Sequence, residues 1–172
     1  MVLCGIECVQ RISQYLDVSP GKLYMSENNN VAANGLVDSQ STEGFSTIIQ
    51  AMVKNSKYPA ILGDDSVTQA LVRQWLEYAA VCINFADNSA FERRVLNELN
   101  TILKTNTYVT GTKKTIADVS MYYSVHGLVN KMSPQEKAEH VHLSRWCDNM
   151  QQDEKLRQSM DSINFNMMHL YL

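Results

Sequence analysis

The sequence has little proline and glycine, and it lacks long apolar runs. Three prolines and seven glycines in 172 residues leave little room for flexible linkers and favour helix. No apolar run reaches the roughly 20 residues that a membrane-spanning helix requires. The first residues also lack the basic leader and the small-residue cleavage site of a secretory signal. We therefore expect a globular protein with no membrane partner.

The sequence also lacks an excess of positive charge and a cysteine framework. With 15 basic and 18 acidic residues, its net charge of -3 gives no concentrated positive field, so we expect no direct nucleic-acid partner. Cys4 and Cys8 lie one helical turn apart, but no further ligand completes a zinc site around them. Neither Cys82 nor Cys147 has a partner in an obvious disulfide pattern. We predict reduced thiols, a cytoplasmic or nuclear location, and no metal or cofactor.

Helix and turn signals organise the first third of the chain. Apolar residues recur every three or four positions at Ile6, Val9, Ile12 and Leu16, which predicts a helix that ends before residue 19. Asn34-Gly35 lies between short apolar segments and predicts a hairpin of two strands. A second helix is expected over residues 44–54. The break at residues 58–65 is the best candidate for a boundary between residues 1–58 and 59–172.

Helical signals dominate the remainder. Four helix starts carry a Ser or Thr followed three residues later by Gln, Glu or Asp, the pattern of a capping box. They are Ser66 with Gln69, Ser89 with Glu92, Thr115 with Asp118, and Ser133 with Glu136. One more short helix is expected over residues 141–150. A small mixed part followed by helices alone predicts a mostly α protein (α+β overall) made of two packed subdomains.

The segment 111–123 resembles the start of the buried helix in glutathione-transferase C-terminal domains. A helix that begins inside a core cannot leave its first N–H groups to water, so Thr115 and Asp118 are expected to bond them. Lys114 stands where that family often has an apolar residue stapling the turn, and its aliphatic stem is a substitute. His126 follows on the same apolar run. Because no nucleophile with a matching acid accompanies it, we interpret it as a hydrogen-bonded core histidine.

Further motifs narrow the resemblance. They are Gln74-Trp75-Leu76-Glu77-Tyr78, Tyr122-Tyr123, Val125-His126, Gln135-Glu136-Lys137 and Leu143-Ser144-Arg145-Trp146. In this order and spacing the chain resembles the epsilon-type scaffold subunits of translation elongation factor one and of the multi-aminoacyl-tRNA-synthetase complex. The resemblance implies a glutathione-transferase-like fold. Its reduced thioredoxin-like N-terminal part would occupy residues 1–58, and its all-α C-terminal bundle residues 59–172.

The same resemblance implies a non-catalytic scaffold that supports translation, with an additional nuclear role in the DNA-damage response. Implied partners are the transferase-like domains of methionyl-tRNA synthetase and glutamyl-prolyl-tRNA synthetase, other such domains of the complex, and a second copy when partners are absent. Positions expected to face outward on the first partner surface are Gln50, Ala51, Lys54, Arg73 and Glu77.

Arg145 is the candidate for the second partner surface. It lies between Leu143 and Trp146, which we expect to be buried, so its side chain should face outward. Its planar fork suits a bidentate pair with a partner's carboxylate. The alternative is an intramolecular salt bridge of little energetic value. The resemblance, whose second surface uses an arginine in this helix, favours the partner.

An atypical glutathione-dependent transferase is the main alternative function. Such an enzyme needs a catalytic residue near its first strand, a cis-proline before its third strand, and an acidic residue paired with a serine at the next helix start. Here the chain opens with a helix, residues 31–33 contain no proline, and Glu43 and Ser46 match only loosely. We therefore predict no catalytic residue. A third hypothesis is a transferase-like domain that only homodimerises.

Overall fold

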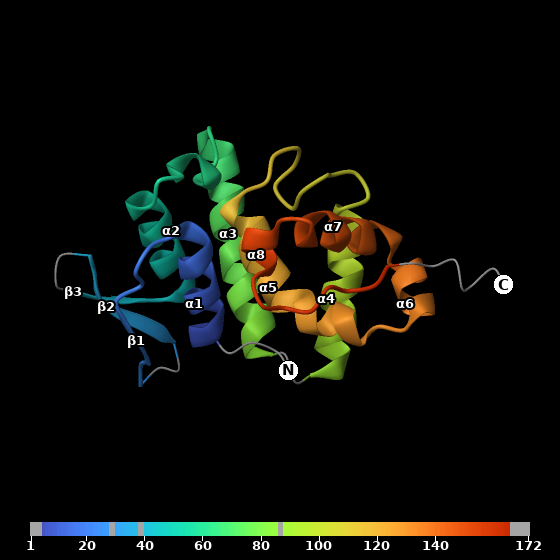
Figure 1. The fold of residues 1–172 in the computed structure, drawn as a ribbon, viewed down its shortest axis with the longest axis horizontal. Helices are drawn as coiled ribbons and strands as arrows, with labels where there is room; N and C mark the ends of the chain where they lie inside the picture. Colours follow the sequence, from blue (N-terminus) through green and yellow to red (C-terminus); the bar gives the residue numbers. More distant parts are fainter. Residues whose placement is uncertain (1–4, 28–29, 38–39, 86–87, 166–172) are drawn as a thin grey trace.

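The computed structural model describes residues 5–27, 30–37, 40–85 and 88–165, and Figure 1 shows a small sheet at one end with helices packed along the rest. The elements are α1 (Gly5–Leu16), β1 (Lys22–Met25), β2 (Val31–Val37), β3 (Gln40–Glu43), α2 (Phe45–Asn55), a 3-10 turn (Pro59–Leu62), α3 (Ser66–Asn84), α4 (Ser89–Ile102), α5 (Ile116–Lys131), α6 (Pro134–Glu139), α7 (Val141–Gln151) and α8 (Glu154–Arg157). Within these residues no helix combines the length and apolar character that a bilayer crossing demands.

The sheet has three antiparallel strands in the order β1-β2-β3, so the predicted hairpin of two strands is wrong. Asn34-Gly35 lies inside β2 and does not turn the chain. The ladder between β2 and β3 is irregular between Asn34 and Val37, and Gly35 has φ of 82°. One type of bulge has a glycine with the same positive φ that a tight hairpin turn needs, so an Asn-Gly pair suits either setting.

Helices α1 and α2 pack on each other and against the sheet (Figure 1). The apolar positions of α1, including Ile12 and Leu16, are buried, and so are Ile48 and Ile49 of α2. These side chains share one core with alternate residues of β2. The 3.6-residue period of the apolar positions therefore sets which face of each helix covers the sheet.

Helix α5 forms the centre of the helical part. Nearly all of its residues are buried, so it has no polar face, unlike the surface helices around it. It packs against α3 and α7, and its apolar residues belong to the same connected core as those of α1 and α2. The two parts of the chain therefore share one hydrophobic interior.

Two of the four expected helix starts are displaced by one residue. The N-cap of α3 is Asp65 rather than Ser66, because the Asp65 carboxylate accepts the N–H groups of Val67 and Thr68 at 2.9 Å each. Asn88 rather than Ser89 caps α4 in the same way. Asp and Asn rank with Ser as N-caps, and in both cases the earlier residue takes the position.

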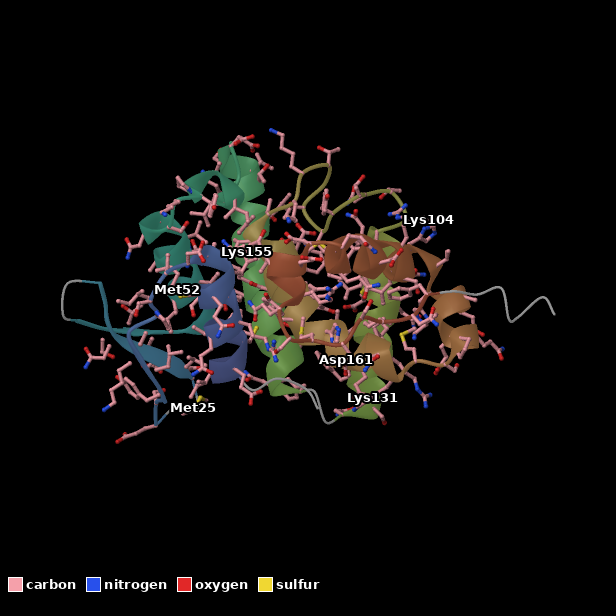
Figure 2. All side chains as sticks on the ribbon, in the orientation of Figure 1. Met25, Met52, Lys104, Lys131, Lys155 and Asp161 are labelled. Atoms are coloured by element: carbon pink, nitrogen blue, oxygen red, sulfur yellow. The ribbon has the colours of Figure 1, made fainter. Side chains whose placement is uncertain are left out.

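Helix α8 ties the end of the chain to its beginning. Lys155, labelled in Figure 2 where α8 meets α1, forms an ion pair with Asp17 at 2.6 Å. The Gln158 amide donates to the carbonyl of Arg11, near the middle of α1, at 2.8 Å. The Tyr123 hydroxyl of α5 donates to the Leu156 carbonyl at 2.7 Å. A segment of one helical turn thus joins α1 to the central helix.

Hydrogen bonds and apolar contacts hold the segment that follows α8 against the helical bundle. Gln151 makes two bonds to Ile163: its amide donates to the carbonyl at 3.0 Å and its amide oxygen accepts the N–H at 2.9 Å. A ring nitrogen of His126 lies 3.0 Å from the carbonyl of Asp161, the tail residue labelled in Figure 2. Ile163 is buried. Residues 166–172 lie outside the described part of the chain.

Candidate partner-binding surfaces

A groove of about 460 Å³ lies between α2 and α3. It is lined by Thr47, Gln50, Ala51, Lys54, Asn55 and Arg73. Four of the five positions predicted for the first partner surface thus meet in one concavity. The fifth, Glu77, is exposed one helical turn beyond Arg73 on α3. The fold brings these positions together because α2 packs directly on α3.

The groove is positively charged. Lys54 and Arg73 are exposed, and neither side chain makes a hydrogen bond or ion pair with any residue in the described ranges. The Gln50 side chain is held against its own helix, where it donates to the Ser46 carbonyl at 3.3 Å and the Ser46 hydroxyl at 3.0 Å. Two cations that pair with no described residue thus line a concave surface, which suits an acidic group of another molecule.

Arg145 is exposed between the buried Leu143 and Trp146. Its Nη2 donates to the Leu103 carbonyl at 2.7 Å and to the Asn106 carbonyl at 3.0 Å, just past the end of α4. This intramolecular role differs from the salt bridge considered from the sequence, because the acceptors are backbone carbonyls. A guanidinium has five N–H donors, so this arrangement leaves others for a partner's carboxylate.

Asn100 of α4 completes a reciprocal arrangement with α7. Its side-chain oxygen accepts the N–H groups of His142 at 3.0 Å and Leu143 at 3.1 Å. These are early N–H groups of α7, whose own N-cap residue makes no side-chain cap bond. Asn100 thus caps α7 while Arg145 bonds the end of α4. No local pattern indicates this role, because Asn100 lies more than 40 residues from the N–H groups it accepts.

Thr115 and Asp118 form a capping box at the buried start of α5. One Asp118 oxygen accepts the Thr115 N–H at 3.0 Å, and the other accepts the Val109 N–H at 2.9 Å and the Trp146 indole N–H at 3.1 Å. Burial raises the pKa of Asp118, while these bonds act in the opposite direction. The carboxylate therefore joins a loop, α5 and α7 in addition to capping the helix.

The positions that would hold glutathione in a transferase are engaged within the chain. A Glu43 carboxylate oxygen accepts the Ser26 hydroxyl at 2.7 Å and the Asn30 amide at 3.2 Å. The Ser46 hydroxyl accepts the Gln50 amide. Throughout the described part of the chain, every peptide bond is trans. These side chains support the sheet edge and α2.

A second cleft, of about 840 Å³, lies between α1, the start of α3, the loop before α5, and α8. Charges of both signs line it: Lys113 pairs with Asp64 at 2.6 Å and Lys114 pairs with Asp153 at 2.8 Å. Lys114 also lies over the Tyr15 ring. An ion pair to α8 thus takes the place of the apolar staple before Thr115. Because basic and acidic side chains line it in similar number, the cleft has no strong preference for anions or cations.

The thiols and the central histidine are buried. Cys8, Cys82 and Cys147 are buried in the core, none of them in a disulfide with another described residue, and Cys4 lies outside the described residues. Burial raises the pKa of Cys82 to about 12, so its thiol stays protonated. Burial lowers the pKa of His126. Among the described residues no group of three or more His, Cys, Asp or Glu side chains could hold a metal ion.

Comparisons with known proteins place the chain in a family. The family described as "Nuclear-export cofactor Arc1p", of the Arc1p N-terminal-like type, matches residues 68–154, just over half of the chain. Eukaryotic translation elongation factor 1 epsilon-1 of Mus musculus is 28% identical over 161 residues, covering 93% of this chain and 92% of the relative. The protein of the same name from Homo sapiens is 31% identical over 131 residues, covering 76% of this chain and 75% of the relative.

A solved structure shares the fold. The class Gtt2 glutathione S-transferase of Vibrio parahaemolyticus superposes with a TM-score of 0.63, covering 92% of this chain and 94% of that one. Its sequence identity is 14%, so the likeness concerns the fold alone. The expected fold class, a glutathione-transferase-like arrangement of a small sheet part and a helical bundle, is confirmed.

Proposed function

The chain belongs to the eukaryotic translation elongation factor 1 epsilon-1 family, and from this premise we propose that it is a non-catalytic scaffold subunit of the multi-aminoacyl-tRNA-synthetase complex. Family membership relates the chain to translation-related cofactors and scaffolds. The proposal adds the partners: the transferase-like domains of methionyl-tRNA synthetase and glutamyl-prolyl-tRNA synthetase.

One observation carries this proposal: the chain has two separate surfaces with cationic donors available to a partner. The first is the groove with Lys54 and Arg73 between α2 and α3, and the second is Arg145 on α7. In Figure 1, α2 and α7 lie on opposite sides of α3 and α5. A protein that joins two others needs two surfaces that can be occupied together, and this arrangement supports that role.

The cellular setting belongs to the same proposal. A scaffold of synthetases acts in the cytoplasm, and the family resemblance adds a nuclear role in the DNA-damage response. Fractionation of cells before and after DNA damage, with detection of the protein in each compartment, tests this part. A protein that stays cytoplasmic under both conditions would leave the scaffold function standing and remove the nuclear role.

The partner proposal is tested with purified transferase-like domains of the two synthetases in calorimetry. Arg73→Glu should weaken binding of the methionyl-tRNA synthetase domain at least about tenfold, because it places a carboxylate next to the partner's acidic group. Arg145→Ala should weaken binding of the glutamyl-prolyl-tRNA synthetase domain only. Lys22→Glu, the same charge change as the first on an exposed β1 residue, is the matched control and should bind both domains normally.

Two results would contradict the scaffold proposal. The first is the absence of binding between the parent protein and both domains. The second is retention on a glutathione column with thiol-conjugating activity, which would favour the atypical transferase. The engagement of Glu43 and Ser46 within the chain supports the expectation that the parent protein passes through such a column.

A further inference from the structure

The outer face of α3 continues beyond the charged groove into an apolar patch. Arg73, Glu77 and Val81 are exposed at successive helical turns, and Val81 has 40% of its surface exposed. Phe85, the C-cap residue of the helix, is 55% exposed. An apolar period in a sequence predicts only the buried side of a helix. The apolar residues on its exposed side were therefore missed.

The Phe85 ring is held in place although it is exposed. It lies 5.6 Å, centroid to centroid, from the ring of Phe91 in the first turn of α4. The Phe85 N–H donates to the Val81 carbonyl at 3.1 Å, and the Asn88 N–H donates to the Phe85 carbonyl at 3.1 Å. The Asn88 side chain also accepts the Phe91 N–H at 3.1 Å, which holds the backbone that carries the second ring. A side chain positioned in this way loses little conformational freedom when a partner covers it.

Apolar and cationic groups lie at opposite ends of this face. Arg73 and Phe85 are 12 residues apart in sequence, which corresponds to about 18 Å along a helix and about 120° around it, so they lie at opposite edges of its exposed side. The cations line a groove, whereas Phe85 does not line it. A matching surface therefore presents a carboxylate at one edge and an apolar recess at the other edge, about 18 Å further along the helix axis.

We propose that Phe85 is the aromatic anchor of the first partner surface. Its partner is a folded helical domain with an acidic side chain opposite Lys54 and Arg73 and an apolar recess for the Phe85 ring. This inference rests on the proposed function, since it extends the same surface. A folded domain fits better than a short peptide, because the recess must be built by the partner. Binding energy concentrates in such aromatic residues, while rim charges mainly set the association rate.

The test uses surface-immobilised transferase-like domain of methionyl-tRNA synthetase and measures association and dissociation rates. Phe85→Ala should weaken binding about tenfold or more, mainly through faster dissociation. Arg73→Glu should slow association and reduce its dependence on salt. Val67→Ala is the matched control, because Val67 is 68% exposed on the first turn of the same helix and does not line the groove. It should change the affinity less than about twofold.

The outcomes separate this inference from the function on which it rests. If Phe85→Ala binds within twofold of the parent while Arg73→Glu weakens binding, the anchor is wrong and the scaffold function stands. If the parent does not bind the domain, both fail. If Phe85→Ala abolishes self-association in sedimentation equilibrium but leaves the synthetase affinity intact, the patch serves a second copy and the inference is overturned. Equal melting temperatures for parent and variant confirm that folding is unaffected.

Discussion

At the scale of single residues, the Asp118 carboxylate connects more of the chain than a helix cap requires. Asp118→Ala would leave the buried donors of Val109 and Trp146 without an acceptor, in addition to removing the cap. We expect it to reduce the free energy of unfolding by about 3–5 kcal/mol. Thr115→Ala removes only the hydroxyl part of the box and should cost about 1–2 kcal/mol. Urea unfolding followed by circular dichroism measures both.

The exposed capping box at the start of α6 is the control for that experiment. There, Glu136 accepts the Ser133 N–H at 2.8 Å in an exposed setting. Glu136→Ala should cost about 1 kcal/mol or less, because water can replace its bonds. A cost for Asp118→Ala no greater than that of Glu136→Ala would show that the buried network adds nothing beyond capping.

His126 gives the protein a pH dependence with a defined sign. Burial lowers its pKa in the folded chain, whereas the unfolded chain has the ordinary value near 6.5. As pH falls below that value, the unfolded state takes up a proton that the folded state resists, so stability decreases. His126→Gln keeps an N–H donor for the Asp161 carbonyl but cannot titrate. Between about pH 7 and pH 5, the parent should therefore lose more stability than the variant.

Urea midpoints at the two pH values measure the difference between parent and variant. Asp118, whose pKa burial raises, contributes with the opposite sign, because acid relieves its buried charge. That contribution is common to both proteins and cancels in the comparison. Parallel pH profiles for parent and His126→Gln would contradict the assignment of the effect to His126.

At the scale of elements, α4 and α7 stabilise each other's ends. Asn100→Ala should cost about 1–2 kcal/mol, because it exposes the first N–H groups of α7. Arg145→Met keeps the aliphatic stem but loses the bonds to the carbonyls that end α4. If the two devices act as a unit, a double-mutant cycle in urea should give a coupling of at least about 0.5 kcal/mol. Strictly additive costs would mean that each end is stabilised independently.

The sequence predicts those elements whose signals are local. Helices α1, α2 and α7 follow from apolar periodicity, and Ser133 with Glu136 forms the expected capping box. Local signals fail where two structures use the same residues. Asn34-Gly35 serves a bulged strand as well as a hairpin, and Asp65 takes the cap from the neighbouring Ser66. Neighbouring strands and loops decide such cases.

At the scale of the whole molecule, the candidate surfaces depend on contacts distant in sequence. Lys54 and Arg73 meet in one groove only because α2 packs on α3, and the family resemblance rather than any local pattern placed both on one face. The carbonyl acceptors of Arg145 lie about 40 residues away in the chain, so its internal role could not be foreseen. The exposure of Phe85 was not predicted, because an apolar period indicates only the buried side of a helix.

Simultaneous occupation of both surfaces is the property that separates a scaffold from a simple binding domain. Sites more than about 10 Å apart without shared contacts usually behave independently, with coupling below about 0.5 kcal/mol. We therefore expect the affinity for the glutamyl-prolyl-tRNA synthetase domain to change less than about twofold when the methionyl-tRNA synthetase domain is saturating. Sedimentation velocity of the mixture should show one species with the mass of three chains. Arg73→Glu should leave only the pair with the glutamyl-prolyl-tRNA synthetase domain, and Arg145→Ala only the pair with the methionyl-tRNA synthetase domain. Mutual exclusion of the two domains would instead mean that one surface serves both, and the protein could not join them.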